Sequence, residues 1–128
     1  MSPRGDETSR RKRAYGLGHR AEWAAVALLM LKGYRILARR YIAPGGEIDL
    51  IARRRDTIAF VEVKARPTLD AAMTSITPQK VERISRAARH WIARNQWTAT
   101  SNLRGDAIFV GGLRWPLHQQ AAFELRLG

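Results

Sequence analysis

Two short stretches of the chain carry ionisable side chains where a half-buried β-strand is expected to carry apolar ones. The first is Gly46-Glu47-Ile48-Asp49-Leu50-Ile51, and the second is Phe60-Val61-Glu62-Val63-Lys64. Both alternate with the period of two that is typical of strands, so their acids and their lysine are expected on the sheet rather than in loops. Carboxylates and an amine on neighbouring strands suit the binding of a cation and of a charged substrate.

The residues between the two stretches predict a hairpin and its register. A two-residue turn at Arg55-Asp56 places Asp49 opposite Glu62 and Glu47 opposite Lys64, and a four-residue loop keeps the same pairs. Opposed residues share one face with β-carbons roughly 5 Å apart, where like charges repel. We therefore expect a divalent cation, Mg²⁺ or Mn²⁺, between Asp49 and Glu62, and an ion pair between Glu47 and Lys64.

These groups are the ones that metal-assisted cleavage of a phosphodiester needs. Two carboxylates hold the cation, which polarises the phosphate and lowers the pKa of a bound water, while a lysine orients that water or stabilises charge. An acid followed by Glu-x-Lys is also a common pattern, so a structural network of ion pairs is the alternative interpretation.

The composition of the chain favours a polyanionic partner. Its 128 residues include 23 Lys and Arg against 11 Asp and Glu, which gives a net charge of +12 and points to nucleic acid or an acidic membrane surface. Cysteine is absent, which excludes disulfides and a cysteine nucleophile and fits a cytoplasmic protein. The apolar run Trp23–Leu31 is too short to span a bilayer and lies between Glu22 and Lys32, so we expect no membrane span and no signal peptide.

The first half of the chain predicts a tail, a helix and the opening strands. Residues 1–14 are polar and basic and predict a flexible tail, and residues 15–128 predict a single domain. A helix is expected over 21–32, ended by Gly33; it is apolar nearly all round, which predicts burial against a sheet. A strand is expected over 34–42. The side chains expected on the sheet face against this helix are those of Ile48, Leu50, Val61 and Val63.

The second half begins with a loop or short helical turn over 68–76 and a strong helix start at Thr77 and Pro78. This helix is expected to run to about Asn95, with its cations off the apolar stripe. They form a basic face that is either solvated or in contact with phosphates: Lys80, Arg83, Arg86, Arg89 and Arg94. A strand is expected over 107–110, with weaker extended candidates over 113–117 and 121–127.

The histidines and tryptophans add little to this picture. His19, His90 and His118 show no metal-ligand spacing and are interpreted as ordinary helix or surface residues. Trp23 and Trp91 fall on apolar helix faces, which predicts a place in the core.

Several motifs together resemble the YraN family of small bacterial proteins, over almost the whole chain after the tail. They are Gly18-x-x-x-Glu22 with Ala24-Ala25, the run Gly46 to Ile51, the run Phe60 to Arg66, Lys80, and Arg104-Gly105-Asp106. That family is similar to Holliday-junction resolvases and to the wider restriction-endonuclease-like PD-(D/E)xK superfamily. Two positions depart from these patterns: Gly105 replaces an aromatic residue, which leaves the role of Asp106 open, and Ile48 stands before Asp49 in place of the proline.

The resemblance implies an α/β fold with a restriction-endonuclease-like core. A mixed, mostly antiparallel sheet would be flanked by two main helices, in the order α-β-β-β-α-β. Glu22, which by itself reads as a first-turn carboxylate that favours the helix dipole, becomes a third acidic member of the site. The remaining roles are Asp49, Glu62 and the Val63 carbonyl as metal ligands, Lys64 as the residue that positions the water, Glu47 and Arg66 as supporting or phosphate contacts, and Lys80, Arg83, Arg86 and Arg89 as contacts to the nucleic-acid backbone.

The function expected from the residues and the resemblance together is Mg²⁺-dependent cleavage of DNA, branched DNA included. Two alternatives stay open: a catalytically idle DNA- or RNA-binding protein that keeps the nuclease fold, and a basic RNA- or ribosome-associated protein. A homodimer, which could act on two strands, is compatible with the sequence.

Overall fold

The structure is a computed structural model, and it describes residues 19–111 and 115–128. The predicted tail over 1–14 lies outside the described residues. So do the first residues of the predicted domain and the start of the extended candidate over 113–117.

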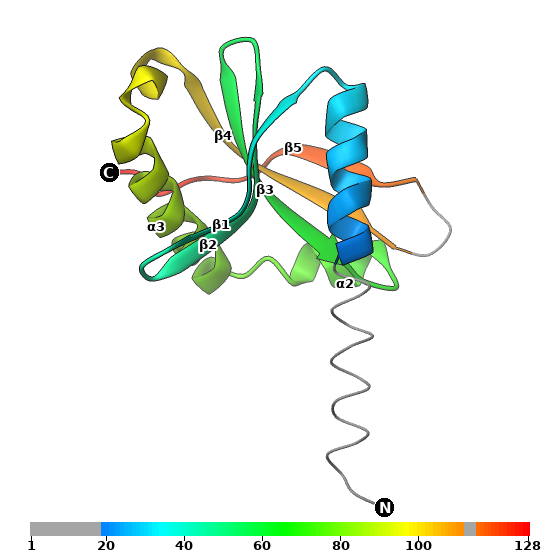
Figure 1. The fold of residues 1–128 in the computed structure, drawn as a ribbon. Helices are drawn as coiled ribbons and strands as arrows, with labels where there is room; N and C mark the ends of the chain where they lie inside the picture. The colour runs from blue at the N-terminus through cyan, green and yellow to red at the C-terminus, as the bar shows by residue number, and fades with distance from the viewer. Residues whose placement is uncertain (1–18, 112–114) are drawn as a thin grey trace, which may run out of the picture.

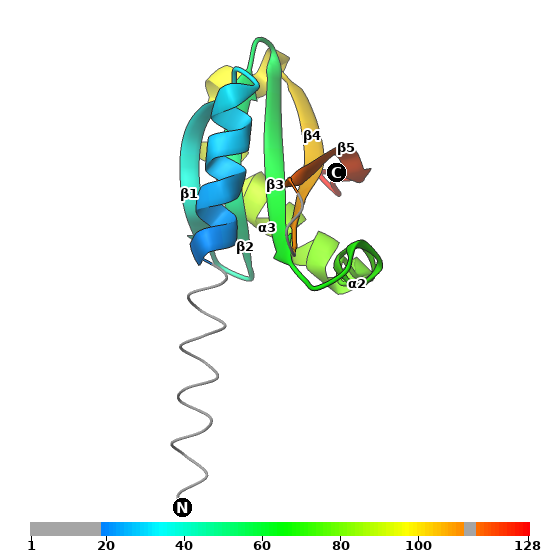
Figure 2. The same cartoon turned by 90° about the vertical axis from the view of Figure 1, so that its right-hand side faces the viewer.

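The sheet has five strands in the order β1-β2-β3-β4-β5. Neighbours pair antiparallel except β3 and β4, which run parallel, so the predicted mixed, mostly antiparallel sheet is confirmed. The strands are β1 (Arg35–Ala43), β2 (Gly46–Arg54), β3 (Thr57–Ala65), β4 (Asn102–Val110) and β5 (Leu117–Phe123). In Figure 2 strands β1 to β4 follow one another from left to right, with the first helix in front of them and α3 behind.

Both predicted helices are present. The first covers residues 19–31 of the described chain, and α3 spans Pro78–Arg94. Gly33, at φ +89°, ends the first helix in a conformation that glycine adopts without strain, and Tyr34 N–H bonds back to the Leu29 carbonyl. The Thr77 side chain accepts from Lys80 N–H, and Pro78 occupies the first turn of α3, as predicted.

The connection between β3 and β4 holds more structure than the predicted order α-β-β-β-α-β allows. Of the loop or short helical turn expected over 68–76, the structure has the helical alternative, α2 (Leu69–Thr74), capped by Thr68, and α3 is followed by the 3₁₀ helix η1 (Gln96–Thr100). Beyond β4, the described residues of the extended candidates over 113–117 and 121–127 include the two ends of β5, which also spans the residues between these candidates. Figure 1 shows α2, α3 and η1 along this crossover.

The core has one layer on each face of the sheet. Ala25, Leu29, Leu50, Val61 and Ile108 are among the residues packed between the first helix and the sheet. On the other face the α3 side chains pack against Ile48, Ile51, Phe60 and their neighbours. The expectation that Ile48 faces the first helix is therefore wrong, whereas Leu50, Val61 and Val63 do face it.

The backbone at Arg40 accounts for the position of Ile48. The β1–β2 register includes Arg39↔Leu50 and Tyr41↔Ile48, but it does not include the intervening residues Arg40 and Asp49. Arg40 has φ +51°, a left-handed conformation that is uncommon for a residue with a Cβ. Because regular pairing is interrupted here, the alternation of sides breaks, and Ile48 and Leu50 lie on opposite faces.

The first helix is buried against the sheet, as expected, but on one side only. Ala21, Ala25 and Leu29 are buried, but the side chain of Trp23 is 54% exposed, so its predicted place in the core is wrong. The Arg39 guanidinium lies 4.0 Å from the centre of the Trp23 ring. Trp91 is buried against Phe60, as predicted. No helix in the described part of the chain is long and apolar enough to cross a membrane.

Candidate functional site

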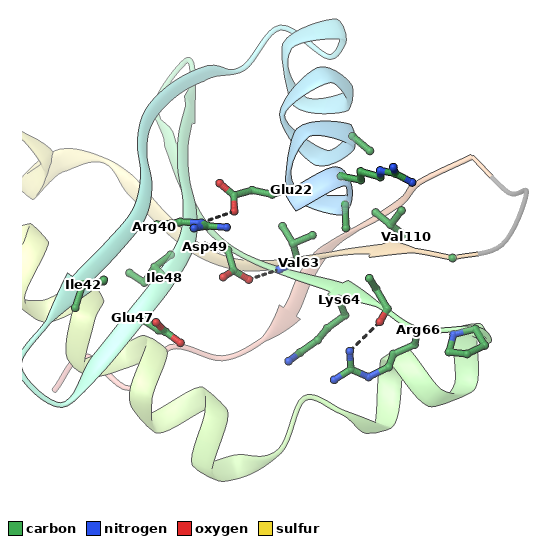
Figure 3. Close-up of a pocket in the computed structure, with 16 residues that line it drawn as sticks. Glu22, Arg40, Ile42, Glu47, Ile48, Asp49, Val63, Lys64, Arg66 and Val110 are labelled. Carbon is green, nitrogen blue, oxygen red and sulfur yellow. Dashed lines mark hydrogen bonds and ion pairs between the residues drawn. The ribbon is translucent and has the colours of Figure 1, made fainter. Parts of the chain in front are cut away.

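A cavity of about 930 Å³ opens where β2 and β3 part, beside the first described turns of the 19–31 helix. Figure 3 shows the side chains around it. The ionisable residues that line it are the acids Glu22, Glu47 and Asp49 and the cations Arg20, Arg40, Lys64 and Arg66. Six residues predicted for the site therefore line one cavity: Glu22, Glu47, Asp49, Val63, Lys64 and Arg66.

The predicted hairpin register is confirmed up to the edge of this cavity. Strands β2 and β3 pair from Arg54↔Thr57 to Leu50↔Val61, and the regular ladder ends there. One residue further on, the Asp49 carboxylate accepts a hydrogen bond from Val63 N–H through Oδ2, at 2.8 Å. A side chain thus links the two strands at the point where Asp49 and Glu62 were expected to form the next ladder pair.

Asp49 is an acid held in an unfavourable environment. Burial, and next the negative charge of Glu62, raise its pKa to about 7, against the opposing effects of the Val63 N–H and Lys64. The like-charge repulsion that the register predicted between Asp49 and Glu62 therefore acts in the folded protein. Within the described residues, Oδ1 of Asp49 makes no hydrogen bond, which leaves that oxygen available to a ligand.

Glu62 and Lys64 are both 6% exposed and form an ion pair on the α3 face of β3. Lys64 Nζ lies 3.0 Å from Glu62 Oε1, and Lys80 Nζ approaches the same oxygen at 3.6 Å from α3. The predicted pair between Glu47 and Lys64 is wrong, because residues 62 and 64 share a face of one strand and Glu47 is exposed at the mouth of the cavity.

The two lysines beside Glu62 respond to it differently. Burial lowers the pKa of Lys64 even though Glu62 acts to raise it. For Lys80 burial is also the largest effect and acts to lower the pKa, but the attraction to Glu62, the contact with Lys64 and the attraction to Asp49 together outweigh it, and the pKa is raised. Lys64 is therefore the amine that gives up its proton more readily, and Lys80 is the amine that stays protonated.

Glu22 lies in the cavity, but its carboxylate is held by two arginines of β1. Oε1 accepts from Arg39 Nη2 at 3.1 Å, and Oε2 accepts from Arg40 Nε at 2.8 Å. Figure 3 shows Glu22 turned toward Arg40, above Asp49. The spacing of Arg39 and Arg40 on the strand expected over 34–42 does not indicate these partners.

Glycine at position 46 brings α3 close to the site. A Cβ at Gly46 would lie 1.9 Å from the Arg83 carbonyl oxygen, so β2 and α3 could not approach this closely with any other residue there. The contact fixes the start of β2, and with it Glu47, against the helix that supplies Lys80.

The basic face of α3 is outside the cavity and partly engaged within the protein. Arg86 Nε lies 3.3 Å from Glu82 Oε1, and Arg89 Nη2 lies 3.5 Å from the same oxygen. The side chain of Arg83 is exposed. Glu82, which the sequence interpretation did not single out, thus competes with a phosphate for two of the four predicted backbone contacts.

A second buried charge network lies at Asp106, on β4. Its carboxylate accepts from Arg104 at 2.7 and 2.8 Å and from Ala121 N–H, and it lies 2.8 Å from His118 Nε2. Lys32 Nζ contacts the other nitrogen of His118, and Arg104 also donates to the Tyr34 hydroxyl. These bonds hold the pKa of Asp106 at about 2 against the effect of burial.

This network corrects the interpretation of His118 as an ordinary helix or surface residue, because its side chain is only 2% exposed. Asp106 itself is fully buried and does not line the cavity. In the sequence, only the Arg104-x-Asp106 spacing, which puts both side chains on one face of a strand, indicates this network.

The donor chemistry of the site suits a hard cation. Asp49 and Glu62 supply carboxylate oxygens, the ligand class that Mg²⁺ prefers, and Val63, whose carbonyl is the predicted third ligand, follows Glu62 in the chain and donates its N–H to Asp49. The described residues contain no group of three or more His, Asp or Glu side chains close enough to form a complete cage. A cation here would therefore rely on the two carboxylates, the backbone and water, as Mg²⁺ commonly does.

The family model described as uncharacterised protein family UPF0102 matches residues 21–110. A UPF0102 protein of Methylorubrum extorquens is 58% identical over 125 residues, which cover 98% of each chain. A UPF0102 protein of Methylocella silvestris is 59% identical over 118 residues, which cover 92% of this chain and 95% of the relative.

Proposed function

The chain belongs to the UPF0102 family, which is the YraN family that its motifs resemble, and from the geometry of Asp49, Glu62 and Lys64 we propose that it is a Mg²⁺-dependent nuclease. The observation that carries the proposal is the juxtaposition of Asp49, Glu62 and Lys64 where β2 and β3 part. Two acids that repel one another, beside an amine of lowered pKa, form a site that a divalent cation would stabilise. Mn²⁺ would serve in place of Mg²⁺.

Each residue has a role that follows from its position. Asp49 and Glu62, with the Val63 carbonyl, would hold the cation, which when bound supplies a water of lowered pKa and a positive charge on the phosphate. Lys64, next to Glu62, orients the attacking water or stabilises the negative charge that develops on the phosphate. Arg20 and Arg66, on the wall of the cavity, would hold the flanking phosphates.

The proposed substrate is DNA, branched DNA included, with RNA as the alternative polyanion. The net charge of +12 and the cationic wall of the cavity support a nucleic acid. Outside the cavity, Lys80, Arg83, Arg86 and Arg89 extend the positive surface along α3. The absence of cysteine supports a cytoplasmic location, and a homodimer would allow two strands to be cut.

One observation favours a second function, a nucleic-acid-binding protein without catalytic activity. Glu22 is neutralised by Arg39 and Arg40, and Glu62 is neutralised by Lys64 and Lys80. Acids that already have cationic partners gain less from a metal ion. In this case the basic surface alone would provide the function.

Cleavage assays distinguish the two functions. Labelled junction, flap and linear DNA would be incubated with Mg²⁺, with Mn²⁺ and with chelator. We expect a metal-dependent product that Asp49→Asn abolishes and that Asp56→Asn, a matched change in the exposed β2–β3 turn, leaves intact. Binding without any metal-dependent product on these substrates would overturn the nuclease and leave the binding protein.

A further inference from the structure

A second cavity, of about 760 Å³, adjoins the first at the carboxyl ends of β3 and β4. The two share Arg66, Pro67, Val110 and Gly111 as a common wall, and Figure 3 shows Arg66 and Val110 at that side of the first cavity. The rest of the lining is mainly apolar and comes from α2, β4, Trp115 before β5 and the first residue of β5: Leu69, Ala72, Phe109, Trp115 and Leu117, with Thr68 and Asp70 as its polar members. An apolar hollow therefore opens directly beside the cationic one.

Trp115 is the exceptional residue of this second cavity. Its side chain is 82% exposed, more than that of any other large apolar residue described. The other exposed tryptophans have cations over their rings: Arg39 lies over Trp23 and Arg53 over Trp97. Within the described part of the chain, no arginine or aromatic ring covers Trp115.

We propose that the second cavity is a stacking subsite for one unpaired nucleobase, with Trp115 as the platform. The inference rests on the proposed function, because it places the phosphate of that nucleotide in the first cavity. Arg66 stands on the shared wall, where the sugar-phosphate backbone would pass from one cavity to the other. An exposed aromatic ring beside a cationic groove is the arrangement with which proteins bind single-stranded nucleic acid.

A consequence for substrate choice follows from the geometry of base pairing. A base inside a continuous duplex is stacked between its neighbours and cannot also stack on Trp115 without leaving the helix, which costs unstacking energy. A base at a flap, gap or junction is already free. The subsite therefore selects nucleic acids that have an unpaired nucleotide next to the bond in the first cavity, over continuous duplex.

The test measures binding, with chelator present so that nothing is cut. The probe is a labelled duplex with a single-stranded DNA flap, either intact or with one abasic nucleotide moved in turn through the positions next to the branch. We expect one abasic position to weaken binding to the native protein by about five- to 150-fold, the range given by the loss of one stacked base. Trp115→Ala should bind intact and abasic flaps equally, and Trp115→Phe should restore part of the difference.

Trp97→Ala is the matched control, since Trp97 is 51% exposed but lies on η1 and lines neither cavity. Trp97→Ala should show the same difference in binding between intact and abasic flaps as the native protein. Equal binding of intact and abasic flaps by the native protein, or an unchanged dependence in Trp115→Ala, would overturn the subsite while leaving the proposed nuclease intact. Failure to bind any of these DNAs would overturn both, and the cleavage assay above reports on the nuclease separately.

Discussion

The Asp49 carboxylate accepts a hydrogen bond from the backbone N–H of Val63, one residue beyond the last regular pair of the β2–β3 hairpin. This bond holds the acid at the end of the ladder, close enough to Glu62 for the two charges to repel. This repulsion lowers the free energy of unfolding, and experiments can measure the effect.

The first prediction is that Asp49 makes the fold less stable as pH rises. Its pKa is about 7 in the folded protein and about 3.9 when unfolded, so the folded state binds more protons between these values. The free energy of unfolding contributed by this group is fully present below pH 4 and is lost as pH rises through 7. Asp49→Asn keeps an oxygen for Val63 N–H but cannot ionise.

Urea unfolding at pH 5 and pH 8 checks this prediction. Asp49→Asn should exceed the native protein in stability by a wider margin at pH 8 than at pH 5, and Asp56→Asn should show no such widening. An equal margin at both pH values would mean that Asp49 is not destabilised by its surroundings.

A second prediction concerns the metal. At pH 8, Mg²⁺ at ten times its dissociation constant should raise the free energy of unfolding by about 1.4 kcal/mol, because it binds only the folded acids. Removal of the ion with chelator should reverse the gain. The measurement is thermal unfolding with and without Mg²⁺ of the native protein, Asp49→Asn and Glu62→Gln. Stabilisation by Mg²⁺ that persists in both variants would mean that the ion binds elsewhere.

The third prediction separates metal binding from chemistry at Lys64. Lys64→Met removes a positive charge beside Glu62, so the stabilisation by Mg²⁺ should be kept or increased. Cleavage should nevertheless fall by about 100-fold or more, since the charge on the reacting phosphate loses its partner. Arg94→Met, on the exposed end of α3, is the control; parallel loss of metal binding and cleavage in Lys64→Met would contradict the role given to this lysine.

The Asp106 network gives a fourth prediction, about stability alone. Asp106→Asn leaves Arg104 and His118 without their anion in a buried place, and removal of one partner of such a pair costs about 3–5 kcal/mol. Because the folded pKa is depressed to about 2, the contribution of Asp106 is present above pH 4 and is lost as pH falls toward 2. Urea unfolding at pH 7 and pH 3 should show the difference between native protein and variant shrink at the lower pH.

Much of the fold and part of the site could be predicted from local patterns. Loop length and alternation were sufficient for the hairpin register, and cap residues were sufficient for the start of α3. The left-handed backbone at Arg40 leaves no mark in the alternation of residue types, and for that reason Ile48 was assigned to the wrong face.

The ionic partners were harder to predict, because they depend on tertiary contacts. Lys64 pairs with Glu62 and not with Glu47, because the regular β2–β3 ladder ends before these residues. Lys80 contacts the same Glu62 carboxylate from α3, which follows β3 in the chain. The Asp106 network joins segments up to 86 residues apart, from Lys32 to His118, which single-sequence patterns cannot bring together. Glu22 was placed in the site by family resemblance, but its two arginine partners were not.

The parallel pairing of β3 with β4 has a kinetic consequence. Asp49 and Glu62 meet through a hairpin, whose contacts are local in sequence, whereas Lys80 arrives on a crossover that must be completed before β4 can pair. Local contacts generally form before distant ones, so the acids should come together early, before this lysine can neutralise them. We expect Lys80→Ala to speed unfolding with little effect on the folding rate, which stopped-flow measurements would reveal, and a slower folding rate would show that α3 docks first.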